Sequence, residues 1–222
     1  MTDDNGLAAL RLQIDEIDDQ ILTALAKRQQ LSRKIAQRKA PGSNVYRPDR
    51  EAKLMRQLIV KHDAVTPKLT HALMRHIISA SIAEQKPDYC IGHSALANQL
   101  AHDHAAGFLG LQSYPSADDA YDGLQNHQVD CLIVTDAECQ DIMGKLGRDY
   151  QAYIVARIPF FHHDDEPIGY VICRELPDLS GDDVALVRGP DGTIITSQPS
   201  GAEQALPSGD IIGIYANGIS QI

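Results

Sequence analysis

The sequence predicts a protein in two parts: an N-terminal all-α domain of three helices that forms an intertwined dimer, and a C-terminal α/β domain with a mixed sheet. Residues 7–40 contain no Gly or Pro and carry apolar side chains at alternating steps of three and four residues. This is the pattern of a long helix that packs along a partner helix. Beyond residue 89, short apolar runs alternate with helical patterns, which is typical of a sheet with crossover helices.

The sign of the net charge changes at the place where the pattern of apolar residues changes, near residue 90. Residues 1–90 hold 15 Lys and Arg against 11 Asp and Glu, a net charge of +4, and the rest of the chain holds 5 against 19, a net charge of −14. We therefore expect two domains, residues 1–86 and an acidic domain at 89–222. The basic half suits a small anion, whereas nucleic acid is disfavoured because the whole chain carries −10.

The sequence shows no sign of export, membrane insertion or metal binding. No apolar run reaches the roughly 20 residues of a membrane span, and the first residues lack the basic and apolar regions of a signal peptide. The four cysteines are scattered without a C-x-x-C pair, as in cytosolic proteins that keep their thiols reduced. We expect a cytoplasmic protein with no metal, no cofactor and no membrane partner.

The first helix is too long for a compact monomer. At about 1.5 Å per residue, 34 residues span about 50 Å, which two shorter helices of the same chain cannot cover. A helix of this length with a sustained apolar seam needs a second copy. We therefore expect a homodimer built on the N-terminal half.

One position of the seam carries a charge. The seam consists of Ile14, Ile17, Ile21, Ala24, Arg28, Leu31 and Ile35. A guanidinium on a packing face is costly unless an anion meets it. Either a carboxylate of the protein pairs with Arg28, or this face lines a pocket for an anionic ligand.

Two more helices follow the first. Pro41-Gly42 ends the first helix, and Pro48 suits the first turn of the second, which fades by His62-Asp63. Thr66-Pro67 is an N-cap followed by a proline at the first helical position, and predicts a third helix that runs to about Gln85.

The remainder of the chain reads as strands and helices. The predicted strands are Tyr89–Gly92, Phe108–Leu111, Cys131–Thr135, Tyr153–Ile158, Ile168–Cys173, Val184–Val187, Thr193–Ser197 and Ile211–Tyr215. The predicted helices cover roughly residues 94–104, 116–127 and 137–147.

Basic residues on the first helix fall into two groups. Lys39 follows Arg28 by eleven residues, so the two lie within about 20° of each other around the helix axis. Arg11 precedes Arg28 by seventeen residues and lies about 100° away. It cannot easily reach the same pocket from the same chain, but in an antiparallel dimer it could reach the pocket of the partner.

The other helices offer further polar groups. Ser81 and Gln85 form an i, i+4 pair near the end of the third helix, and the second helix opens with Arg50 and Glu51. Together with Arg28 and Lys39, these residues supply cations, a carboxylate, a hydroxyl and an amide, without a convincing nucleophile or metal-ligand set.

These residues carry a resemblance to a known family. The motifs are Leu10-Arg11-Leu-Gln-Ile-Asp-Glu-Ile-Asp, Leu25-Ala-Lys-Arg28, Ile35-Ala-Gln-Arg-Lys39, Tyr46-Arg-Pro-Asp-Arg50-Glu51 and Ile77-Ile-Ser-Ala-Ser81-Ile-Ala-Glu-Gln85. As a set, over roughly residues 7–86, they resemble the all-helical (AroQ-class) chorismate mutases. The resemblance implies an isomerase of aromatic amino acid biosynthesis, in the shikimate pathway, that converts dianionic chorismate to prephenate.

The resemblance also implies a role for each residue. Arg28 and Arg11 of the second copy would bind the two carboxylates of chorismate. Lys39 would contact a carboxylate and the ether oxygen, and Gln85 would donate to that oxygen, so that Lys39, Gln85 and Arg28 are the catalytic residues. Glu51 would accept from the ring hydroxyl, with Ser81 and Arg50 in support. In one departure, Arg47 stands where some family members have an Asp.

Other interpretations stay open. Isochorismate pyruvate lyase shares the fold and the Arg, Lys and Gln pocket, and a non-catalytic regulatory dimer of the same pathway would also fit. Residues 90–135 faintly resemble the first lobe of prephenate dehydratase, but the glycine-rich start of that family is missing. We therefore expect residues 89–222 to be a degenerate dehydratase-like or regulatory module.

Overall fold

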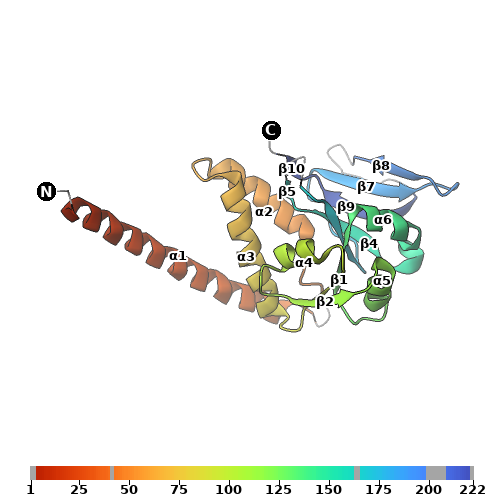
Figure 1. The fold of residues 1–222 in the computed structure, drawn as a ribbon, viewed down its shortest axis with the longest axis horizontal. Coiled ribbons are helices and arrows are strands. Elements are labelled where there is room, and N and C mark those ends of the chain that lie inside the picture. The colour runs from red at the N-terminus through yellow and green to blue at the C-terminus, as the bar shows by residue number, and fades with distance from the viewer. Residues whose placement is uncertain (1–3, 41–42, 163–165, 199–208, 221–222) are drawn as a thin grey trace. The chain divides into compact units, whose positions relative to one another are not determined.

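The computed structural model describes residues 4–40, 43–162, 166–198 and 209–220 (Figure 1). The chain divides into two compact units, residues 1–43 and residues 44–222. The predicted domains, 1–86 and 89–222, are based on the change of composition along the chain. The two units, in contrast, are based on the contacts between residues within one copy of the chain. The predicted division stays a prediction.

In the described part of the first unit, residues 4–40 and 43, the secondary structure is one long helix of 35 residues, α1 (Asp4–Arg38). Its length is about 52 Å at 1.5 Å per residue. The large residues of the seam are 42 to 60% exposed, with Ile35 at the low end and Leu31 at the high end. The apolar face that the heptad pattern predicts is therefore present and accessible on α1.

Helices α2 (Pro48–Lys61) and α3 (Pro67–Gln85) open the second unit and lie side by side. Proline occupies the start of both helices, where its missing N–H costs nothing. The Thr66 side chain accepts a hydrogen bond from the Leu69 amide at 3.3 Å, as an N-cap does. The predicted boundaries of these helices are confirmed.

A mixed sheet of eight strands forms the centre of the second unit, in the order β2-β1-β3-β6-β4-β9-β7-β8. The strands are β1 (Cys90–Ser94), β2 (Gly110–Tyr114), β3 (Cys131–Thr135), β4 (Tyr153–Ile158), β6 (Gly169–Cys173), β7 (Asp183–Arg188), β8 (Ile194–Ser197) and β9 (Asp210–Ala216). Strand β1 pairs in parallel with β2 and β3, and β6 pairs antiparallel with β3 and β4. The predicted fold class is thus confirmed for the C-terminal half.

Short elements complete the second unit. Helices α4 (Asn98–Ala105), α5 (Ala117–Gln125) and α6 (Asp136–Ile142) follow β1, β2 and β3, and two short 3-10 helices span Met143–Lys145 and Arg148–Tyr150. Strands β5 (Phe161–His162) and β10 (Ile219–Ser220) pair with each other. These two strands were not predicted, because two residues are too few to show an alternating pattern.

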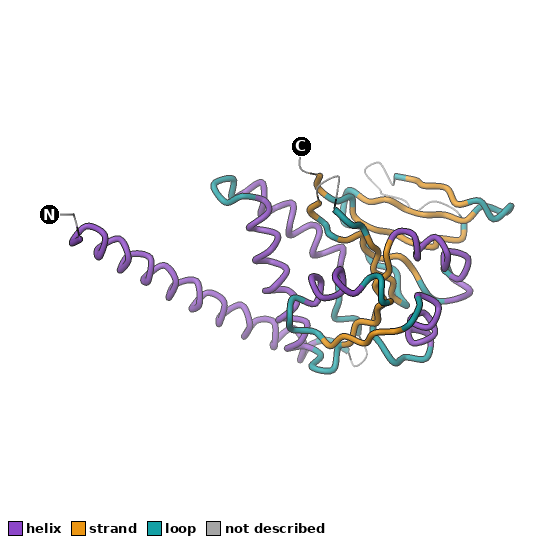
Figure 2. Tube along the Cα trace, viewed as in Figure 1, coloured by secondary structure: helices purple, strands orange, loops and turns teal. Residues whose placement is uncertain are grey.

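The strands of the sheet are drawn in orange in Figure 2. Two clusters of buried hydrophobic side chains cover its two faces. Along β3, Leu132 belongs to the cluster of α5 and α6, and Ile133 belongs to the cluster of α3 and α4. This alternation follows from the two-residue period of a strand. Ile78 and Ile82 of α3 are buried in the second cluster, so α3 packs against the sheet.

Arg56 connects α2 to the segments just before β7 and just after β9 in the same unit. Its guanidinium donates to the Ser180 side chain at 3.0 Å, to the Asp182 carbonyl at 2.7 Å and to the Asn217 carbonyl at 3.1 Å. These contacts explain why the boundary between the units precedes α2.

Among the described helices, none is long and apolar enough to cross a membrane.

Candidate functional site

The seven predicted site residues are distributed over both compact units. Arg11 and Arg28 lie on α1, and Lys39 follows the last helical residue. Arg50, Glu51, Ser81 and Gln85 lie in the second unit, at the start of α2 and near the end of α3.

Lys39 continues the helical path of α1 although it lies one residue beyond the helix. Its amide donates to the Ile35 carbonyl at 3.2 Å, the i to i−4 bond of an α-helix. The helical path therefore extends as far as Lys39, as the predicted angle of about 20° between Arg28 and Lys39 around the helix axis requires.

Ser81 and Gln85 are brought together on one side of α3. The Ser81 hydroxyl donates to the Ile77 carbonyl at 2.7 Å, and Gln85 Nε2 donates to the Ser81 carbonyl at 3.0 Å. Ser81 is buried and Gln85 is half-buried. The structure thus places a hydroxyl and an amide next to each other in the last two turns of α3.

Glu51 forms an ion pair that the sequence did not reveal. Arg75 Nη1 donates to Glu51 Oε2 at 2.8 Å, and both side chains are at least four-fifths buried. Arg75 Nε donates to the Ser79 hydroxyl at 3.2 Å. Burial opposes the charge of Arg75, but the Glu51 carboxylate outweighs it, and the pKa of Arg75 is raised.

A sequence signal for Arg75 was nevertheless present. Arg75 precedes Ile78 by three residues and Ile82 by seven, so it lies on the apolar stripe of α3 that packs against the sheet. A charge on an apolar stripe is the same signal that identifies Arg28. Its partner, 24 residues earlier in the chain, could not be read from the sequence.

The residues around Arg50 form a separate polar group. Arg50 is exposed in the first turn of α2. Arg47 donates through Nε and Nη2 to the buried Asp49 carboxylate, both at 3.0 Å, and Nη2 also donates to Asp178 at 2.6 Å. The basic residue at position 47, where some family members have an Asp, is thus neutralised by carboxylates.

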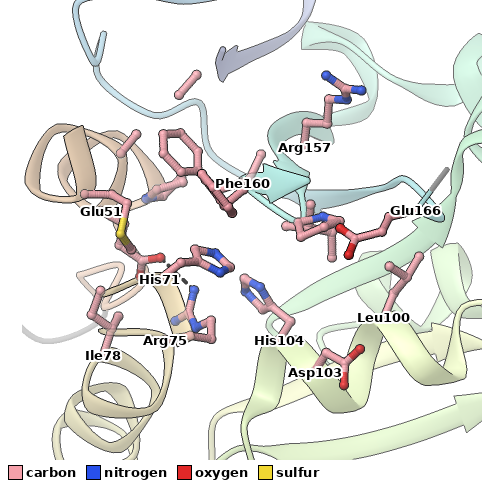
Figure 3. A pocket seen from close by; sticks show the side chains of 18 of the residues that line it. Glu51, His71, Arg75, Ile78, Leu100, Asp103, His104, Arg157, Phe160 and Glu166 are labelled. Atoms are coloured by element: carbon pink, nitrogen blue, oxygen red, sulfur yellow. Dashed lines mark hydrogen bonds and ion pairs between the residues drawn. The ribbon is translucent and has the colours of Figure 1, made fainter. Parts of the chain in front are cut away.

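A cavity of about 490 Å³ lies within the second unit, lined by α2, α3, α4 and the segment around the end of β4. Of the predicted site residues, Glu51 alone belongs to its described lining. Arg75 lines the same cavity, beside His71 and His104 (Figure 3). The Glu51–Arg75 pair therefore joins a predicted substrate residue to a cavity that the sequence did not predict.

Comparison with known proteins identifies the family of the N-terminal segment. Residues 10–86 match the family model described as chorismate mutase type II. The search of curated proteins finds no match. A solved structure titled "GqqA- a novel type of quorum quenching acylases" aligns with a TM-score of 0.40 at 10% identity, over 57% of this chain and 94% of that one. A likeness this weak bears on neither fold nor function.

Proposed function

We propose that the protein catalyses the rearrangement of chorismate to prephenate in a pocket shared by two copies of the chain, since residues 10–86 match the family model of chorismate mutase type II. The observation that carries the proposal is the family match, which includes all seven predicted site residues. Chorismate mutases are isomerases of aromatic amino acid biosynthesis.

The chemistry requires positioning and electrostatics, without a nucleophile or a base. The [3,3] rearrangement is unimolecular, and one bond from the ether oxygen to carbon breaks while a carbon–carbon bond forms. The protein must hold the diaxial, chair-like conformer, which is a proximity effect. It must also stabilise the negative charge that develops on the ether oxygen, which preorganised donors do best.

The proposed roles divide along these two requirements. Arg28, with Arg11 of the second copy, binds the two carboxylates and fixes the conformer. Lys39 and Gln85 donate to the ether oxygen. The bond from Gln85 Nε2 to the Ser81 carbonyl supports this role, since it keeps the amide on one side of α3.

Glu51 accepts a hydrogen bond from the ring hydroxyl in this scheme, while Arg50 and Ser81 support substrate binding. Arg75 Nη1 donates to Oε2 of Glu51 at 2.8 Å, which fixes the position of this carboxylate. An ionised carboxylate has about four acceptor positions, so Glu51 can bind Arg75 and still accept from a hydroxyl. Arg75 thus acts as a positioning residue for Glu51.

The second copy follows from the exposed seam of α1. A helix of 35 residues with large apolar side chains at heptad spacing is stabilised when a partner helix covers that face. Pairing of two α1 helices in antiparallel orientation carries Arg11 of one copy toward Arg28 and Lys39 of the other. The dimer is therefore part of the proposed active site.

The test is a chorismate conversion assay on the full chain and on Lys39→Ala. We expect the wild-type protein to form prephenate, and Lys39→Ala to lose at least about a hundredfold in kcat/KM, the usual cost of removing one donor to a developing oxyanion. Lys27→Ala, which replaces an exposed lysine of α1, serves as the matched control and should keep wild-type activity.

Two results would contradict the proposal. One is a wild-type protein that leaves chorismate unchanged, or that releases salicylate and pyruvate from isochorismate and no prephenate from chorismate. The other is Lys39→Ala with the turnover of Lys27→Ala at the same dimer content.

A further inference from the structure

The walls of the cavity in the second unit come from both halves of the sequence. Its α2 and α3 walls come from the segment that matches the mutase family, and its α4 and β4 walls come from the acidic half. Its volume, about 490 Å³, is within the roughly 300–1,000 Å³ of small-molecule sites. Much of the wall is apolar and includes Met55, Ile78, Leu100, Ile158, Phe160 and Phe161.

Arg75, which lines this cavity, has a pair of N–H donors without a hydrogen-bond partner among the described residues. A guanidinium carries five N–H groups. Arg75 Nε donates to Ser79 and Nη1 donates to Glu51. Nη2 is buried and has no hydrogen-bond partner among the described residues. Buried donors are nearly always satisfied in native proteins, so an acceptor is missing at Nη2.

The position of this guanidinium is fixed from three helices. Glu51 holds it from α2, and Ser79 holds it from within α3. The Ser79 hydroxyl in turn donates to the His104 carbonyl on α4 at 3.1 Å. A group that is held on two sides before a ligand arrives loses little entropy on binding.

Two imidazoles lie beside the unused donors. Figure 3 shows the rings of His71 and His104 next to the Arg75 guanidinium. His104 is also held by an edge contact to the Tyr46 ring, with centroids 5.6 Å apart. Burial, followed by the charge of Arg75, lowers the pKa of both imidazoles, so at neutral pH each ring offers one neutral N–H donor.

The charges that line the cavity weigh against a ligand with two negative charges. The acidic lining residues are Glu51, Asp103 and Glu166, and the basic ones are Lys68, Arg75 and Arg157. With neutral imidazoles these charges cancel. A monoanion at Arg75 is therefore tolerated, whereas a dianion would bring a second charge against apolar walls.

We infer that this cavity binds a small monocarboxylate with an apolar body. The carboxylate accepts hydrogen bonds from Arg75 Nη2 and from the imidazoles of His71 and His104, while the body packs against Ile78, Leu100 and Phe160. This site goes beyond the proposed mutase reaction, because its ligand is neither chorismate nor a dianion.

Calorimetric titration of the full chain in the absence of chorismate tests the inference, with 3-phenylpropanoate as the probe and the uncharged 3-phenylpropanamide as its isostere. We expect one acid molecule per chain, with the amide and inorganic phosphate each binding at least about tenfold more weakly. The amide lacks the charge, and phosphate lacks the apolar body.

Variants then locate the site. Arg75→Lys keeps the charge but loses the Nη2 donors, and Ala72→Phe narrows the cavity from an exposed position of its lining with Arg75 intact. Both should weaken binding of the acid by at least about tenfold. Arg148→Lys, an exposed arginine outside the lining, should bind like the wild type.

The inference is overturned if the acid does not bind, if the amide or phosphate binds as tightly, or if neither cavity variant weakens binding. Because the titration contains no chorismate, its outcome is independent of whether the protein is a mutase.

Discussion

Charged residues on apolar stripes are the most informative positions of this chain. Arg28 interrupts the seam of α1, and Arg75 interrupts the stripe of α3 that packs against the sheet. The structure supplies the carboxylate of Glu51 for Arg75. For Arg28 we propose a substrate carboxylate, since Arg28 lies within the residues that match the chorismate mutase type II family model.

The buried imidazole of His104 makes stability depend on pH. Its pKa in the folded protein is lowered well below the usual 6.5, first by burial and then by Arg75 and His71. Above pH 6.5 the ring is neutral in both the folded and the unfolded chain. As the pH falls below 6.5, the unfolded chain takes up a proton that the folded protein does not, so the free energy of unfolding falls.

Urea unfolding at pH 7, 6 and 5, at one protein concentration, measures this effect. His104→Gln should reduce the loss of stability toward low pH by up to about 1.4 kcal/mol per pH unit. His102→Gln, which replaces an exposed histidine of the same helix, should keep the wild-type slope. Equal slopes for the two variants would contradict the account of His104.

At the scale of elements, helix starts and apolar periods could be predicted from the sequence. Pro48 and Thr66-Pro67 mark the starts of α2 and α3 through local chemistry, and the period of α1 is visible over five turns and more. The attachment of α2 and α3 to the sheet could not be predicted. It depends on contacts such as Arg56 with Ser180, which lie 124 residues apart.

The seam of α1 leads to a prediction about assembly. Ile21→Asp places a carboxylate in the middle of the seam, and burying it against a partner helix is costly. We expect the dissociation constant of the dimer to rise at least about a hundredfold, which corresponds to about 2.7 kcal/mol. Sedimentation equilibrium of the full chain measures this change.

Thr23→Asp is the matched control for the seam. Position 23 lies on α1 two residues after Ile21 and outside the heptad set, and it is exposed. The same charge at this position should leave the dimer intact. A monomeric wild-type protein, or equal dissociation of the two variants, would contradict pairing through the seam.

At the scale of the whole molecule, different parts of the chain have different proposed functions. The proposed mutase pocket draws on residues 10–86, and the observed cavity, which shares Glu51 with it, is bounded by α2, α3, α4 and the end of β4. The candidate residues of the proposed mutase pocket rest on the spacing of their motifs along the helices, which is specific as a set, and their grouping stays a prediction. The cavity could not be predicted, because its walls come from segments as far apart in the chain as Tyr46 and Ala216.

The central claim is a mutase pocket that takes Arg28 from one copy and Arg11 from the other. Two variants, Arg11→Ala and Arg28→Ala, separate these contributions. Each alone should lose at least about a hundredfold in kcat/KM, because each lacks one carboxylate contact in both pockets of its dimer.

The decisive measurement is prephenate formation after the two variants are unfolded together in equal amounts and refolded. In a mixed dimer, one pocket combines the intact Arg28 of one copy with the intact Arg11 of the other, and the second pocket lacks both. Since about half of the dimers are mixed and each has one intact pocket, the account predicts recovery of about a quarter of wild-type activity. Activity no greater than that of the separate variants would contradict the shared pocket.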